Sequence, residues 1–99
     1  MWRGVTSDFE WDEAKNRLNI SKHGIDFLDV PRVFEQPLLV RRDDRRQYEE
    51  DRWIAMGVLS GVVIVTVYAR RGPRLRIISA RRANQRERTI YEQALGQTP

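Results

Sequence analysis

The chain has 99 residues, 18 Lys plus Arg against 14 Asp plus Glu, and no cysteine. This length predicts one domain over residues 1–99, and the lack of thiols excludes disulfides and thiolate metal sites. No apolar stretch approaches the ~20 residues of a membrane helix, and no signal peptide is recognisable. We therefore expect a cytoplasmic protein that contacts no membrane.

The charge is unevenly distributed along the chain. Residues 1–51 carry nine Lys plus Arg against twelve Asp plus Glu, a net charge of −3, whereas residues 52–99 carry nine Arg and two Glu, a net charge of +7. Sixteen of the 18 cations are Arg, whose rigid fork of donors suits phosphate, although a GC-rich genome would give the same bias. The basic second half indicates nucleic acid as a partner.

The N-terminal quarter predicts a strand followed by a helix. Residues 1–7 show no pattern and are expected to be partly mobile. Residues 9–11 predict a short edge strand that buries its two aromatic side chains. Asp12 is a typical N-cap and Gly24 a typical C-terminal glycine for the helix between them. Two apolar residues share one face of this helix, Ala14 and Leu18.

A second helix is expected after Gly24. Asp26 or Asp29 could cap it, but Pro31 is tolerated only in a first helical turn. We therefore predict that the helix starts near Asp29 and ends near Glu35. Its expected buried residues are Val30, Val33 and Phe34.

The rest of the chain predicts strands and a closing helix. Strands are expected over residues 38–40, 52–58, 62–70 and 74–82, with a hairpin turn at Ser60-Gly61. The charged segment 41–51 is interpreted as a solvated loop. Asn84 with Glu87 three residues later is a capping-box pattern, and the helix that follows should end at Gly96. Its expected apolar face is Ile90, Tyr91, Ala94 and Leu95.

This order of elements predicts an α+β fold. A single-layer antiparallel sheet of three or four strands would pack on N-terminal helices and a C-terminal helix. The open face of the sheet would then carry arginine side chains.

Several short fragments occur in an order that resembles a known family. They are Phe9–Lys15, Asn19, Lys22–Gly24, Phe27, Val33–Phe34, Arg52, Gly57, Tyr68–Arg70 and Arg76–Ala83. The set resembles the BrnT family of ribonuclease toxins from BrnT–BrnA toxin–antitoxin pairs. The resemblance implies a RelE-like domain that cleaves RNA and inhibits translation. It also implies neutralisation by a BrnA-like antitoxin of the ribbon-helix-helix class, with promoter DNA bound only through the antitoxin complex.

Metal-independent RNA cleavage needs a base for the 2′-hydroxyl, a donor for the leaving oxygen and cations for the phosphorane. Arg52 and Arg81 are the first candidates, because each ends a predicted strand and the resemblance places active-site arginines there. Either could instead be solvated, or paired with Glu50 or Glu87. With one histidine and no ligand spacing among the carboxylates, we expect no metal and no cofactor.

Three residues are candidates for proton transfer. His23 has an unperturbed pKa near neutrality, but a histidine before a helix-ending glycine also stabilises the negative end of the helix. Lys22 could do either. Glu87 is the remaining acid, but its capping-box role explains it without catalysis.

Four residues are candidates for RNA binding: Tyr68, Arg70, Arg76 and Arg82. Tyr68 and Arg70 share one face of their strand and could stack on a base and hold a phosphate, or Tyr68 could line the rim of the core. Arg76 and Arg81 differ by an odd number of residues and point to opposite faces of an unbroken strand. Arg81 also shares parity with Leu75 and Ile77, so a bulge or a strand end near Ser79 would be needed to free it.

Two other classes of function fit the same charge. The chain could be a non-catalytic nucleic-acid-binding module, or an interaction domain whose sheet face docks a protein. Basic charge alone does not separate these from an enzyme, whereas the resemblance favours the toxin.

Overall fold

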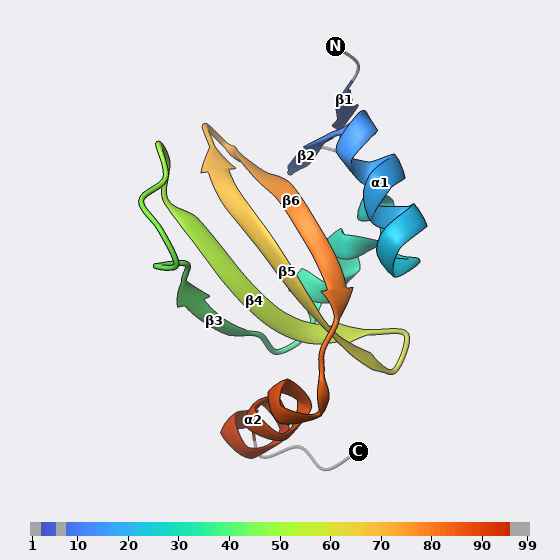
Figure 1. Ribbon diagram of the computed structural model, residues 1–99, viewed down its shortest axis with the longest axis vertical. Coiled ribbons are helices and arrows are strands. Elements are labelled where there is room, and N and C mark those ends of the chain that lie inside the picture. The colour runs from blue at the N-terminus through green and yellow to red at the C-terminus, as the bar shows by residue number, and fades with distance from the viewer. Residues whose placement is uncertain (1–2, 6–7, 96–99) are drawn as a thin grey trace.

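Six strands form one mixed sheet in the computed structural model, which describes residues 3–5 and 8–95. In chain order the elements are β1 (Arg3–Val5), β2 (Phe9–Asp12), α1 (Glu13–His23), the 3₁₀ helix η1 (Phe27–Glu35), β3 (Leu39–Arg42), β4 (Arg52–Leu59), β5 (Val62–Arg71), β6 (Arg74–Arg82) and α2 (Gln85–Leu95). Figure 1 shows α1 beside β2 and β6, with α2 beyond one end of the sheet. No helix in the described part of the chain is long and apolar enough to cross a membrane.

The predicted α+β class is confirmed, but the sheet is wider than expected and is not purely antiparallel. Its strand order is β1-β2-β6-β5-β4-β3, and β2 runs parallel to β6. Residues 9–11 do not form an edge strand, because residues 3–5 of the expected mobile lead pair with β2 as β1. Residues 1–2 and 6–7 lie outside the described residues. The parallel pairing of β2 with β6 joins segments far apart in the chain, and local sequence patterns do not encode it.

Both predicted caps of α1 are confirmed. The Asp12 carboxylate accepts hydrogen bonds from the backbone N–H groups of Ala14 and Lys15, at 2.8 and 3.2 Å. Gly24 has a φ of 70° and donates its N–H to the Ile20 carbonyl, which closes the helix in the left-handed conformation that glycine favours.

The buried face of α1 is polar. Asn19 donates to the Ile25 and Ala80 carbonyls at 2.9 Å and accepts from the Ala80 N–H at 3.1 Å. Asn16 binds the start of η1 in the same way. Ala14 and Leu18 are exposed. The helix therefore docks by satisfying buried backbone groups of β6 and of the following loop.

The predicted start of the second helix at Asp29 was wrong. The helix begins at Phe27, and Asp26 is its cap, accepting from the Leu28 N–H at 2.9 Å. It is a 3₁₀ helix, with three residues per turn. Its fully buried side chains therefore recur every third residue, at Phe27, Val30 and Val33.

Strands β4, β5 and β6 form the predicted meander, with the hairpin turn at Ser60-Gly61. Both turn residues have positive φ, 50° and 80°, as a type I′ turn requires. The capping box of α2 is also confirmed: Asn84 and Glu87 exchange hydrogen bonds of 2.9 and 2.8 Å. Of its expected apolar face, Tyr91 is buried and Ile90 is exposed; Gly96 lies outside the described residues.

The sheet has two faces with separate clusters. We call one the helix-covered face; α1 and η1 pack on its core residues Trp11, Ile64, Ile77 and Ala80. We call the other the open face; its smaller cluster contains Ile54, Val65 and Val67, with Ile78 against them.

A β-bulge in β6 decides which side chains reach the open face. Val67 of β5 pairs with Ser79, but Tyr68 pairs with Ile77, so Ile78 is an extra residue. Of the two irregularities expected near Ser79, a bulge or a strand end, the structure has the bulge, and β6 continues to Arg82. Because of the bulge, Arg76 and Arg81 lie on the same face despite their odd spacing.

Candidate functional site

Three of the predicted arginines reach the open face. Arg52 begins β4 opposite Ala69, Arg76 lies on the other side of Ala69, and Arg81 near the end of β6 pairs with Val65. Their environments differ, and these differences show which arginines are held in structural ion pairs and which can still bind a ligand.

Arg52 is the least committed of the three. Its guanidinium carbon lies 4.2 Å from the centroid of the Tyr48 ring, a cation–π contact. Its Nε is buried and has no hydrogen-bond acceptor among the described residues, and no described carboxylate pairs with it. A buried N–H without an acceptor is unfavourable, so an anion that reached this group would gain a hydrogen bond.

Arg81 is held by Glu87 but keeps free donors. Its two terminal nitrogens donate to the two Glu87 oxygens at 2.8 Å each, and a third N–H donates to the Arg82 carbonyl at 3.3 Å. Since a guanidinium has five N–H donors, two remain for a ligand. The Arg81 side chain is 43% exposed, so these donors can be reached from solvent.

Glu87 behaves as a fixed carboxylate. Hydrogen bonds from Arg81 lower the pKa of Glu87 from 4.5 to about 2, and the N–H of Asn84 adds to the effect. A group that stays ionised down to this pH is a weak proton carrier near neutrality. Its geometry suits positioning of Arg81 and capping of α2.

Arg76 is part of an internal ion pair. Its Nη1 lies 3.0 Å from the Glu10 carboxylate, and the two side chains are only 15% and 8% exposed. Glu10 comes from β2, the parallel neighbour of β6. The pair therefore joins these two strands, and Arg76 offers little to a ligand.

The sequence predicted a solvated loop between β3 and β4, but the structure shows that this charged segment is organised around a buried carboxylate. Asp43 is buried and accepts from Arg45 Nε and Nη2 at 2.8 Å each and from the Tyr48 hydroxyl at 3.2 Å. Its own N–H donates to the Arg52 carbonyl at 2.8 Å. The Arg45 guanidinium holds the pKa of the Asp43 carboxyl well below its usual range. One buried carboxylate thus organises residues 43–52.

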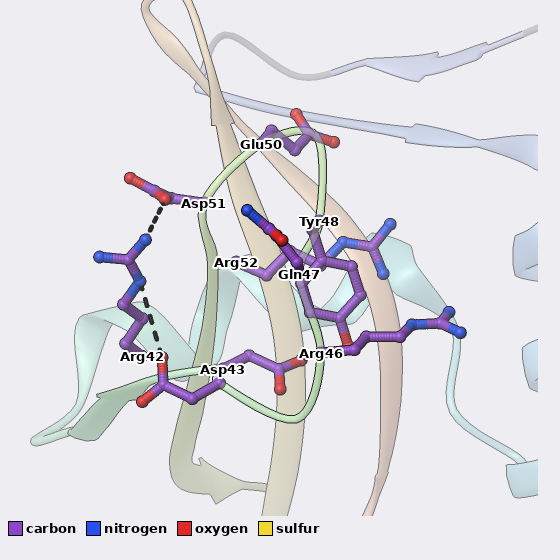
Figure 2. Close-up of a pocket in the computed structure, with 9 residues that line it drawn as sticks. Arg42, Asp43, Arg46, Gln47, Tyr48, Glu50, Asp51 and Arg52 are labelled. Carbon is purple, nitrogen blue, oxygen red and sulfur yellow. Dashed lines mark hydrogen bonds and ion pairs between the residues drawn. The ribbon is translucent and has the colours of Figure 1, made fainter.

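Two neighbouring open hollows lie beside this segment. Figure 2 shows the larger, about 470 Å³, in which Tyr48 lies beside Arg46 and Arg52 while Arg42 bridges two aspartates at the rim. The second, about 370 Å³, opens on the sheet. Its lining residues are Arg45, Arg46, Tyr48, Arg52, Val67, Ile78 and Ser79. We call this second hollow the sheet pocket.

Sequence reasoning missed Asp43, Arg45, Arg46 and Tyr48 as parts of the site. The available signal was Tyr48 itself, the single aromatic residue within a run of charged side chains. Asp43 two residues before Arg45 also allows an Asx turn, and the Arg45 N–H does donate to Asp43, at 3.3 Å.

Tyr68 and Arg70 do share one face, but it is the helix-covered one. Tyr68 pairs with Ile77 and meets the Phe34 ring edge-on, with centroids 5.1 Å apart. Burial raises the pKa of Tyr68. With Arg70 it lines a separate hollow beside Trp53, on the opposite side of the sheet from Arg52.

Lys22, His23 and Arg82 lie at a third place, the end of α1. Arg82 pairs with Ile64 on the helix-covered face, and its Nη1 donates to the His23 backbone carbonyl at 3.4 Å. The contact uses the backbone of His23 and not its imidazole. The predicted site residues therefore divide among three locations, and only Arg52, Arg76, Arg81 and Glu87 share the open face.

Comparison with known protein families gives a match over most of the chain. A family model described as the ribonuclease toxin BrnT of type II toxin–antitoxin systems matches residues 11–87. No curated protein matches the chain significantly. The matched segment covers more than half of the chain and includes the open face, the organised segment 43–52 and the Arg81–Glu87 pair. The chain therefore belongs to the BrnT family, the ribonuclease toxins of type II toxin–antitoxin systems.

Proposed function

We propose that this ribonuclease toxin cuts single-stranded RNA internally on its open face, without a metal ion, between Arg52 and Arg81. The observation that carries the proposal is Arg52, a partly buried arginine with no described anionic partner and an unsatisfied Nε at the edge of the sheet pocket. Cutting messenger RNA in this way would inhibit translation.

The proposed chemistry is attack by the 2′-oxygen on the neighbouring phosphorus. The 2′-oxygen–phosphorus bond forms, the phosphorus–5′-oxygen bond breaks, and the 2′-proton leaves as a proton is supplied to the 5′-oxygen. The products are a 2′,3′-cyclic phosphate and a 5′-hydroxyl. Negative charge grows on the phosphorane oxygens, and arginine N–H donors fixed beside them stabilise the transition state more than the ground state.

Electrostatics would supply most of the acceleration. The carboxylates around the open face are held in ion pairs, Asp43 with Arg45, Glu50 with Arg71 and Glu87 with Arg81. His23 lies on the opposite side of the sheet, which argues against a direct proton transfer from it. Removal of one donor to developing charge costs about 10²–10³ in rate, so two arginines account for a substantial enhancement.

The test uses purified toxin and an RNA oligonucleotide in the presence of EDTA. We expect cleavage, a 2′,3′-cyclic phosphate end, and no cleavage of an oligonucleotide whose nucleotides are all 2′-deoxy. Cleavage that requires an added divalent cation would overturn the metal-independent mechanism. Tight binding of intact RNA by folded toxin, with no cleavage, would favour a binding module instead.

A type II toxin has a cognate antitoxin, and we propose that this one is a BrnA-like ribbon-helix-helix protein that covers the open face. An apolar groove of about 330 Å³ runs beside Glu87 and would seat part of it. The groove is lined by Leu39, Val40, Arg41, Ile54, Met56, Val65, Glu87 and Ile90. Acidic residues of the antitoxin would then meet Arg52 and Arg81.

This arrangement is tested by measuring antitoxin affinity for the Arg52→Glu/Arg81→Glu double variant. A large loss of affinity relative to an Arg17→Glu variant on exposed α1 is expected. Equal affinity for wild type and the double variant would mean that neutralisation does not work by covering these two arginines.

A further inference from the structure

We infer that the sheet pocket is a nucleotide subsite, which seats one nucleotide of single-stranded RNA. Its base would lie against Ile78 and Tyr48, and its phosphate would bind Arg46 and Arg52. This inference rests on the proposed function and names the part of the site that holds the substrate.

Arg52 lines the pocket, and the pocket floor lies between the register positions of Arg52 and Arg81 on the sheet. Its floor residues Val67 and Ser79 pair across β5 and β6. On β5, Val67 is two residues from Ala69, the partner of Arg52, and two residues from Val65, the partner of Arg81. Each of these two-residue separations spans about 7 Å along the strand. A nucleotide seated there has Arg52 toward one end and Arg81 toward the other.

The charge of the pocket suits a phosphodiester. Arg45 is neutralised by Asp43 at 2.8 Å, whereas neither Arg46 nor Arg52 pairs with any carboxylate in the part of the chain that the structure describes. Their guanidinium carbons lie 5.3 and 4.2 Å from the Tyr48 ring centroid. Arg46 and Arg52, which both contact the Tyr48 ring, therefore face a pocket whose lining residues include no carboxylate.

The floor of the pocket suits a base. The bulge gives β6 an extra residue, and Ile78 packs against the apolar cluster of the open face. Ile78 is only partly buried, so an aliphatic surface remains uncovered between the cations. Contact of a flat base with apolar and aromatic side chains is favourable and does not depend on the identity of the base. Ser79 also lines the pocket and offers a hydroxyl group.

The wall of the pocket is preformed. Asp43 holds both Arg45 and the Tyr48 hydroxyl, and its backbone N–H fixes the start of β4 at Arg52. A wall that is already ordered loses little conformational entropy when ligand binds. Asp43 and Tyr48 would therefore act as positioning residues for Arg52.

The test measures binding apart from cleavage, with a fluorescent 2′-O-methyl RNA oligonucleotide that cannot undergo 2′-oxygen attack. Tyr48→Ala and Arg46→Ala should each weaken binding about 10-fold, which is within the range for loss of one stacked base or one phosphate contact. Tyr48→Phe keeps the ring beside Arg52 and should stay within about 3-fold of wild type. Gln47→Ala, an exposed change in the same segment, is the matched control.

A second probe separates base contact from phosphate contact. With an oligonucleotide that carries abasic sites throughout, the effect of Tyr48→Ala should shrink to the part that comes from positioning Arg46 and Arg52, while Arg46→Ala should keep its full effect. If wild type cleaves RNA but Tyr48→Ala and Arg46→Ala bind the methylated oligonucleotide like Gln47→Ala, the subsite is refuted and the proposed function stands. If wild type neither binds nor cleaves RNA, the proposed function itself fails. Since Arg46 is exposed, its variant keeps the test valid even if Tyr48→Ala disturbs the fold.

Discussion

Replacing Arg81 with alanine should abolish most activity while leaving the fold intact. The change removes the two free donors of Arg81 and also its paired hydrogen bonds to Glu87. If those donors stabilise the phosphorane, cleavage should slow by about 10²–10³. The matched control is Arg86→Ala, a change at an exposed arginine of α2.

The cost of this change in stability follows from exposure. Arg81 and Glu87 are 43% and 23% exposed, so solvent screens the pair, and its contribution is about 1 kcal/mol. The capping bonds between Asn84 and Glu87 remain. A loss of ~1 kcal/mol lowers Tm by about 4–8 °C in a chain of this size. From a typical stability of at least ~5 kcal/mol, more than about 99% of the protein stays folded.

Unfolding therefore cannot explain a hundredfold loss of rate. The assay is single-turnover cleavage of a labelled RNA with EDTA present, together with thermal unfolding followed by circular dichroism. Cleavage by Arg81→Ala at the rate of Arg86→Ala would refute the assignment. A fall in Tm far beyond ~8 °C would show that Arg81 is chiefly structural.

Two further variants test the Arg81–Glu87 ion pair and the docking of α1. The pKa of Glu87 is lowered in the folded state, so its contribution to the free energy of unfolding should be full above pH 4.5 and should be lost as the pH falls toward about 2. Glu87→Gln keeps a capping side chain, and in urea unfolding at a series of pH values it should show a weaker dependence of stability on pH between 4.5 and 2. An unchanged dependence on pH would contradict the ion pair. Asn19→Ala removes three buried hydrogen bonds from Asn19 to the backbone of Ile25 and Ala80, and it should lower the free energy of unfolding by about 2–4 kcal/mol. A loss no larger than that of the exposed change Arg17→Ala would mean that the docking of α1 does not depend on Asn19.

Much of the local structure could be predicted from neighbouring residues. Asp12, Gly24, Ser60-Gly61 and the Asn84–Glu87 box each act within four residues of chain, so their effects can be read without knowledge of the rest. A bulge in β6 was one of the two irregularities expected near Ser79, because Arg81 shares strand parity with the apolar residues Leu75 and Ile77.

The prediction was weaker wherever partners come from distant segments. The buried face of α1 is polar because Asn19 binds the backbone of Ala80, which lies 61 residues later in the chain. The start of η1 was misplaced because the fully buried residues follow a three-residue period that an α-helical reading does not expect.

The sequence by itself determined the family, the α+β class, the cationic second half and the candidacy of Arg52 and Arg81, because these depend on residue identity and short-range order. Only the tertiary structure decided which candidates share a surface. The pairing of the strands placed Tyr68 and His23 away from Arg52, and the burial of Asp43 turned a charged segment into the wall of a pocket. The physical reason is that each side of a sheet is assigned by register, and register is set by contacts summed over the whole chain.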